Sequence, residues 1–155
     1  MYIKGRFISY GEPLNEVFAI RKAVFQDEQG MTNDMDQDGK DKEAVHVVAY
    51  EIGNENRPVA TGRICMLDNE FRIGKIAVLK EERGKYYGDF VVRMLVDKAF
   101  LSGAKKVSVS AITTAVHFYE KIGFHKTGEE YMENGTPHVM MYLDQGDLCS
   151  KCHEK

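Results

Sequence analysis

The chain has 155 residues, of which 43% are hydrophobic and 29% are charged, and its formal net charge at pH 7 is -3. This length is typical of one domain with its own core, and the composition is that of a folded globular protein. A mildly acidic chain lacks the concentrated basic surface of most nucleic-acid-binding proteins. No apolar run approaches the roughly 20 residues that span a bilayer, so we expect neither a nucleic-acid nor a membrane partner.

The chain ends and the cysteines indicate the organisation and the compartment. The first residues carry charges without a long apolar stretch behind them, so they do not resemble a secretory signal. We therefore expect a cytoplasmic protein whose three cysteines, Cys65, Cys149 and Cys152, stay reduced. Because no repeat or Pro/Gly/Ser-rich linker divides the chain, residues 1–145 are expected to form one domain and residues 146–155 a tail.

The N-terminal third predicts a strand, a helix and an acidic loop. Residues 2–9 are predicted to form an edge strand, and Pro13 is typical of the first turn of a helix. The apolar residues after this proline recur at helical spacing: Leu14, Val17, Phe18, Val24 and Phe25. From residue 26 to residue 43 the chain is polar and acidic, which predicts a solvated, mobile surface loop.

The middle of the chain predicts three strands that form an antiparallel meander, at residues 45–52, 59–67 and 71–79. A helix follows, whose apolar side chains share one face: Val92, Leu95, Val96 and Ala99. Gly103 is expected to end this helix.

The last third predicts a strand at residues 107–111 and then a short helix that Thr113 or Thr114 caps and Gly123 ends. Two further strands are expected at residues 125–131 and 139–143, joined at Asn134-Gly135. The element order predicts an α+β fold with a mixed, largely antiparallel central sheet flanked by helices.

The turn between the third meander strand and the next helix carries the most chemical information. It contains Gly84 and Gly88, and Arg83 and Lys85 add positive charge. The first N–H groups of a helix lack internal acceptors, the helix dipole is positive there, and glycine allows an anion to approach closely. The turn therefore fits a diphosphate cradle, and a simple connector is the alternative that these features leave open.

Two motifs in the chain resemble the GNAT superfamily of N-acetyltransferases. Residues 78–88, V-L-K-E-E-R-G-K-Y-Y-G, are similar to its acetyl-CoA motif Q/R-x-x-G-x-G/A. Arg83 matches the first position and Gly88 the last, whereas Tyr86 stands where a glycine is usual. Residues 115–124 resemble the F-Y-x-K-x-G-F box of a later helix.

Finer similarity points to the ElaA-like and YjcF-like branch, and the resemblance implies a GNAT-like fold. The matching residues in the N-terminal half are R-K-A-V-F at 21–25, then Glu28, Gln29, Asp36, Asp38 and His46. Near the end, residues 135–141, G-T-P-H-V-M-M, resemble the G-I-P-H-x-x-M ending of that branch. Acceptors in this branch are unclear, so the resemblance implies only an amine of a small molecule or peptide. Homodimers are frequent in the superfamily, so the resemblance makes a homodimer possible, but no residue pattern specifies an interface.

The resemblance implies that an amine attacks the thioester of acetyl-CoA directly, without a covalent enzyme intermediate. The strand end would bind the pantetheine arm and polarise the thioester, and the turn would bind the diphosphate. The expected acetyl-CoA-binding residues are Ile76, Ala77, Val78, Arg83, Gly84, Lys85, Tyr86, Tyr87, Gly88, Asp89 and Phe118. Tyr119 is the expected general acid that protonates the leaving thiolate, and a packed aromatic ring is the alternative.

The general base is expected to be His46 or Glu28, with His138 behind them, although a lone histidine on a strand is more often structural. Arg63 and His138 are the expected acceptor-binding residues, and a surface ion pair is the alternative for Arg63. The acidic loop would border the acceptor site, where its charge would favour a cationic acceptor.

Two alternative functions remain open from the sequence. One is a catalytically silent acyl-CoA-binding sensor or interaction domain, which the departure at Tyr86 makes worth testing. The other is acyl-homoserine-lactone synthesis, against which the short length and the G-T-P-H ending weigh. No metal is expected, because Cys149, Cys152 and His153 supply only three ligands in a frayed tail. The aspartates at 34, 36 and 38 lack the glutamate that closes a Ca²⁺ loop.

Overall fold

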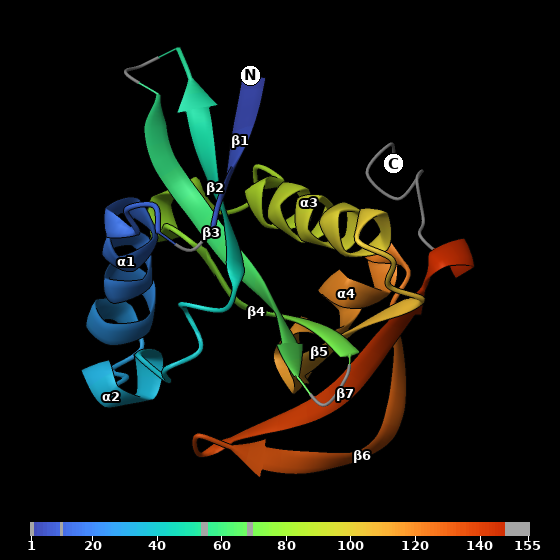
Figure 1. Cartoon of the computed structure of the whole chain (residues 1–155). Coiled ribbons are helices and arrows are strands. Elements are labelled where there is room, and N and C mark those ends of the chain that lie inside the picture. Colours follow the sequence, from blue (N-terminus) through green and yellow to red (C-terminus); the bar gives the residue numbers. More distant parts are fainter. Residues whose placement is uncertain (1, 10, 54–55, 68–69, 148–155) are drawn as a thin grey trace.

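The computed structural model describes residues 2–9, 11–53, 56–67 and 70–147, which form one sheet with helices on both faces (Figure 1). The strands are β1 (Tyr2–Ile8), β2 (Val45–Ile52), β3 (Arg57–Leu67), β4 (Glu70–Val78), β5 (Lys106–Ile112), β6 (His125–Glu133) and β7 (Thr136–Asp144). The α-helices are α1 (Asn15–Arg21), α2 (Asn33–Asp36), α3 (Tyr87–Leu101) and α4 (Val116–Ile122). A π-helix, η1 (Lys22–Glu28), continues α1, and short 3-10 turns are η2 (Lys80–Glu82), η3 (Thr113–Ala115) and η4 (Gln145–Asp147).

The seven strands follow the order β1-β2-β3-β4-β5-β7-β6. Every neighbouring pair is antiparallel except β4 and β5, which run parallel. The predicted mixed, largely antiparallel sheet, the meander and the edge position of the first strand are therefore confirmed. The predicted Asn134-Gly135 turn is also confirmed, since both residues have positive φ, 51° and 77°, as a type I′ hairpin turn requires.

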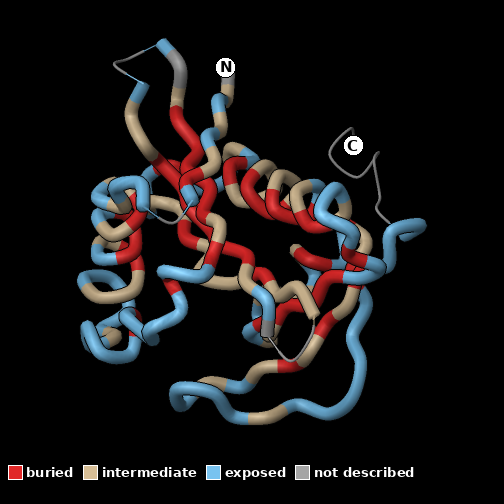
Figure 2. Tube along the Cα trace, viewed as in Figure 1, coloured by how far each residue is buried: buried red, intermediate tan, exposed pale blue. Residues whose placement is uncertain are grey.

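The sheet is buried on both faces where it is covered by helices (Figure 2). Alternate residues of β2 point to opposite faces, so Val47 packs with α3 in the larger core while Val48 packs with α1 in the smaller one. Figure 1 shows α1 and α3 on the two sides of this half of the sheet. The apolar face predicted for α3 is confirmed, because Val92, Leu95 and Val96 are fully buried.

Two local predictions are wrong. Residues 26–43 are not simply a solvated loop, because the chain continues the π-helix, forms α2 and buries Asp36 and Asp41. Thr113 and Thr114 do not cap a helix, since they lie in the 3-10 turn η3 and α4 begins after it without a side-chain cap. The first error has a physical cause, described below, in two buried arginines that need counter-charges.

The tail expected from residue 146 lies mostly outside the described residues, and so do Cys149, Cys152 and His153. The domain boundary at residue 145 therefore stays a prediction. Cys65 is a free, half-buried thiol. Within the described ranges, no helix has the length and the apolar character that crossing a membrane requires.

Candidate active site

The two parallel strands of the sheet separate soon after they meet. β4 and β5 pair only from Phe71–Val107 to Ile73–Val109, and beyond that point β4 pairs with β3 alone. A β-bulge lies in the half of β4 that has no β5 partner, where Lys75 and Ile76 together face one residue of β3. Lys75 adopts a left-handed backbone conformation there, with φ of 52°. Because of the bulge and the separation, some main-chain groups of β4 form no hydrogen bond within the sheet.

A cleft of about 840 Å³ lies across this separation. Its walls come from the η1–α2 segment, β3, β4, β5, η3, α4 and the β6–β7 hairpin. Five of the predicted site residues line it: Arg63, Ile76, Phe118, Tyr119 and His138. The structure therefore gathers one predicted residue of β4, two residues of the second motif and two predicted acceptor-binding residues into one cavity, whereas residues 78–88 do not line it.

The turn before α3 keeps main-chain donors available. The first hydrogen bond of the helix runs from Phe90 N–H to Tyr86 O, at 3.0 Å. Within the described residues, the N–H groups of five residues donate no hydrogen bond: Gly84, Lys85, Tyr86, Gly88 and Asp89. Tyr86 takes the left-handed conformation, φ 68°, that glycine favours, and the side chain is 65% exposed. The tyrosine therefore reproduces the glycine backbone without filling the turn with its ring.

Charged side chains of this turn are held by neighbouring carboxylates. Arg83 donates to both carboxylate oxygens of Glu28, at 2.6 and 2.7 Å, and to the carbonyl oxygen of Val78. Lys85 donates to Glu82 at 2.9 Å. A Cβ placed on Gly88 would lie 3.5 Å from the Phe118 ring, so this glycine faces α4.

Other predicted acetyl-CoA residues have different surroundings. Asp89 pairs with Arg93 at 2.7 Å and lines a separate groove of about 470 Å³ beside β1. Tyr87 is buried, and its hydroxyl lies 3.4 Å from Glu51. Ala77 packs in the smaller core on the α1 side of the sheet. The side chain of Ala77 therefore does not line the cleft.

Tyr119 lies on α4 with its ring packed edge-on against two phenylalanines. The ring centroids of Phe118 and Phe124 lie 4.9 and 5.6 Å away. The side chain is only 7% exposed, and burial raises the pKa of Tyr119 well above its usual value. Within the described residues its hydroxyl has no hydrogen-bond partner, although it lines the cleft. Tyr119 is thus a protonated phenol at neutral pH with an unused O–H.

The structure separates the three base candidates. His46 is 1% exposed, lies outside the cleft lining, and donates from Nε2 to the carbonyl oxygen of Asp41 at 3.0 Å. Glu28 also lies outside the lining and is held by Arg83. His138 lines the cleft, and Nδ1 must be its protonated nitrogen, since this atom lies 2.8 Å from the carbonyl oxygen of Thr136. Its Nε2 lies 3.6 Å from a carboxylate oxygen of Glu133.

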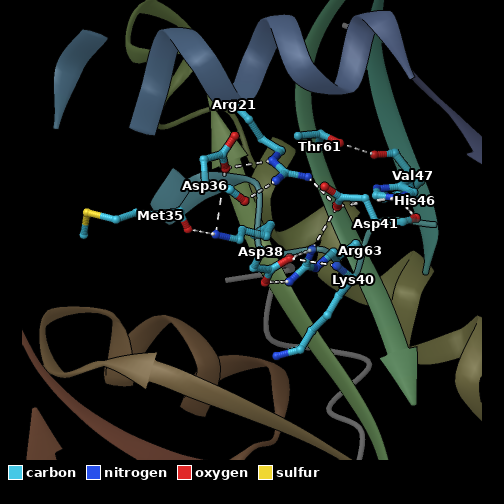
Figure 3. A network of polar contacts seen from close by, with 11 residues as sticks. Arg21, Met35, Asp36, Asp38, Lys40, Asp41, His46, Val47, Thr61 and Arg63 are labelled. Atoms are coloured by element: carbon cyan, nitrogen blue, oxygen red, sulfur yellow. Dashed lines mark hydrogen bonds and ion pairs between the residues drawn. The ribbon is translucent and has the colours of Figure 1, made fainter. Parts of the chain in front are cut away.

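A network of buried charges forms the wall between α1 and β3 (Figure 3). Arg21, fully buried, donates to Asp36 Oδ1 at 3.0 Å and to Asp41 Oδ1 at 2.7 Å. Arg63 donates to Asp41 Oδ1 at 2.8 Å and to both carboxylate oxygens of Asp38. Burial alone would raise the pKa of Asp38, but the hydrogen bonds and charge of Arg63 outweigh it and hold that pKa below the usual range. These pairs explain why the acidic segment folds inward.

The same network changes how Arg63 must be interpreted. Its side chain lines the cleft, as expected for an acceptor-binding residue, yet it is only 6% exposed. Its guanidinium is already bound by two aspartates, so neither a free carboxylate receptor nor a surface ion pair describes it.

His46 gives a pH prediction for stability. Burial lowers the pKa of His46, so below about pH 6.5 His46 takes up a proton in the unfolded chain but stays neutral in the folded protein. The free energy of unfolding should therefore decrease as the pH is lowered below this value, by at most about 1.4 kcal/mol per pH unit from this group. Replacing His46 with glutamine keeps a donor for the Asp41 carbonyl but removes the titration. Urea unfolding measures the free energy of unfolding at several values between about pH 7 and pH 5. This free energy should depend less steeply on pH in the variant than in wild type, and an equal pH dependence would contradict this assignment.

Several cleft residues had no signal in the sequence. Lys40, Cys65, Arg72, Lys75 and Glu133 all line the cavity. They come from a loop, two strands and a hairpin end that only the fold brings together. No motif or spacing pointed to them.

Comparisons with known proteins agree with this geometry. An acetyltransferase (GNAT) domain model matches residues 12–145. A Bacillus subtilis (strain 168) protein named as an uncharacterized N-acetyltransferase, YjcF, is 33% identical over 134 residues, covering 86% of this chain and 94% of that protein. The crystal structure of Escherichia coli ElaA matches with a TM-score of 0.81 and 25% identity, covering 92% of this chain and 100% of that one.

A third match has a ligand. A GNAT family acetyltransferase from Elizabethkingia anophelis, solved with acetyl-CoA bound, has a TM-score of 0.68 and 18% identity over 92% of this chain and 97% of that one. At this identity the match shows the shared fold. With the domain model covering most of the residues and both branch relatives matching nearly end to end, this chain belongs to the ElaA- and YjcF-like branch of the GNAT acetyltransferase family.

Proposed function

We propose that this protein transfers an acetyl group from acetyl-CoA to an amine of a small molecule or peptide. Two observations along one stretch of chain carry the proposal: β4 has no β5 partner beyond Ile73, and the turn that follows β4 has N–H groups without acceptors before α3. Unpaired main-chain donors at a helix start bind phosphate groups well, and the dipole of a helix of 15 residues assists them. The acetyl-CoA bound by the Elizabethkingia anophelis relative supports the same substrate here.

The diphosphate would be bound by the amides of Gly84, Lys85, Tyr86 and Gly88, and the pantetheine arm would lie along Ile76, Ala77 and Val78 beside Phe118. The fit supports this, because the Tyr86 ring is largely exposed and glycine at position 88 keeps the backbone free of a side chain beside Phe118. A main-chain N–H near the β4 bulge would donate to the thioester oxygen and stabilise its developing negative charge.

The transfer needs two proton movements. The amine nitrogen attacks the carbonyl carbon, a C–N bond forms, and the C–S bond then breaks to release the coenzyme thiolate. Tyr119 would donate its phenolic proton to that sulfur. His138 would take the proton lost by the amine, since its Nε2 is unprotonated in the neutral ring and lines the same cleft. Glu133, 3.6 Å from this nitrogen, would stabilise the imidazolium.

A glycine substitution tests the binding half of the proposal. Gly88→Glu should weaken acetyl-CoA binding at least about 100-fold, or about 2.8 kcal/mol, because its carboxylate would stand where the diphosphate binds. Gly146→Glu is the matched control, since a Cβ there meets no atom within 4 Å and no positive φ is required. Isothermal titration should show tight binding for wild type and the control only.

Turnover separates an enzyme from a sensor. Thiol release from acetyl-CoA with a panel of primary amines should be detectable for wild type and lost in Gly88→Glu. Acetyl-CoA binding without release for any amine would contradict catalysis and leave the acyl-CoA sensor. Equal binding by both glycine variants would contradict the proposed cradle itself.

A further inference from the structure

The charges that line the cleft do not match the cationic acceptor that the acidic sequence favours. Four cationic side chains line it, Lys40, Arg63, Arg72 and Lys75, against the carboxylates of Asp38 and Glu133. Asp38 and Arg63 bind one another, so neither is available to a ligand, and Lys40, Arg72 and Lys75 remain against Glu133. The cleft therefore has an excess of positive charge.

Three of these cations gather around Cys65 on β3. Burial raises the pKa of the Cys65 thiol, and the nearby charges of Arg63, Lys40 and Arg72 oppose that rise. Arg72 is held in place by Glu70, at 2.9 Å, and by Ser108. Its side chain remains 25% exposed, so it can still face a ligand in the cleft.

Lys40 differs from the other cleft cations. Among the described residues its ammonium group has no hydrogen-bond or ion-pair partner, while Arg63, Arg72 and Lys75 all have carboxylate partners. Figure 3 shows the Lys40 side chain extending away from the aspartate–arginine network rather than joining it. The cleft thus contains an unpaired cation beside a second, partly exposed one.

The opposite wall has a different chemical character. His138 and Glu133 lie on the β6–β7 hairpin, where they would attract and deprotonate an ammonium group. Tyr119 lies in the same cavity. A ligand that carries an amine and an anionic group would therefore meet a complementary charge at each end.

We propose that the acceptor is an amine that also carries a carboxylate, bound by Lys40 and Arg72 while its amine faces His138. This inference rests on the proposed function, since it names the acceptor of the same reaction. Lys40 and Arg72 would act on substrate binding, so they should govern the acceptor's KM more than kcat.

The experiment compares linear amino acids, from glycine to 6-aminohexanoate, with their carboxamides as acceptors. For the chain length that fits, KM of the carboxylate should be at least about tenfold lower than that of the amide, or about 1.4 kcal/mol. Lys40→Glu should reverse this preference. Lys42→Glu makes the same charge change two residues along, outside the cleft lining, and should leave the preference unchanged.

A binding measurement keeps this inference separate from catalysis. Titration with the N-acetylated forms of the same compounds, which resemble products, requires no turnover. Binding of the carboxylates that is lost in Lys40→Glu and kept in Lys42→Glu would support the inference, even if no amine were acetylated. Equal affinities and equal KM values for carboxylates and carboxamides would overturn it, while thiol release with both would leave the proposed acetyl transfer standing.

Discussion

Replacing Arg21 with methionine is expected to lower the free energy of unfolding by about 3–5 kcal/mol. Arg21 is fully buried and supplies hydrogen bonds to Asp36 and Asp41, which are 1% and 8% exposed. Methionine has similar length and can still pack against Phe18, over whose ring the guanidinium now lies. The loss would therefore come mainly from two buried carboxylates that lose their contacts with Arg21, so that Arg63 and Lys75 alone remain to balance them. Urea denaturation at pH 7 measures this loss.

The neighbouring residue provides the control. Lys22 pairs with Asp27 at the surface, where the two side chains are 64% and 62% exposed, and Lys22→Met should cost at most about 1 kcal/mol. Adding Asp36→Asn to Arg21→Met should recover part of the lost stability, because the uncompensated charge is removed. Similar losses for Arg21→Met and Lys22→Met would contradict the central position of Arg21 in the network.

The network also marks where sequence reasoning stops. The strands and α3 were predictable because their apolar periods are local, as Val92, Leu95 and Val96 illustrate. The burial of Asp36 and Asp41 was not, since it depends on Arg21 and Arg63, which contact Asp36 and Asp41 from 15 and 22 residues away along the chain. A run of aspartates is typical of a solvent-exposed loop, and only the structure shows that arginines bind these ones.

The candidate site divides in the same way. The turn before α3 was predictable because one short segment contains the glycines, and the positive φ of Tyr86 shows how a side chain there is tolerated. The choice among bases was not predictable, because the Asp41 carbonyl and Arg83 occupy His46 and Glu28 through contacts between distant segments. Lys40 likewise stands out as a cleft-lining cation without a partner only once Asp38 is known to pair with Arg63.

Replacing Tyr119 with phenylalanine should lower kcat about 10²- to 10⁴-fold, the range for removal of a general acid, while acetyl-CoA affinity stays unchanged. The substitution removes one oxygen that has no hydrogen-bond partner within the described residues, and the ring packing against Phe118 and Phe124 is kept. Stability should therefore change by no more than about 0.5 kcal/mol. Steady-state thiol release, isothermal titration and urea denaturation measure the three quantities.

The pH profile distinguishes a proton donor from a packing residue. A general acid stops working when pH exceeds its pKa, and burial raises the pKa of Tyr119. The alkaline limb of kcat that Tyr119 sets should therefore lie above about pH 10, the ordinary value for tyrosine. Tyr142→Phe, on β7 outside the cleft lining, removes an equivalent hydroxyl and should leave kcat unchanged. Full activity of Tyr119→Phe, with acetyl-CoA binding intact, would require another proton donor, and a shared loss in both variants would indicate a general packing effect.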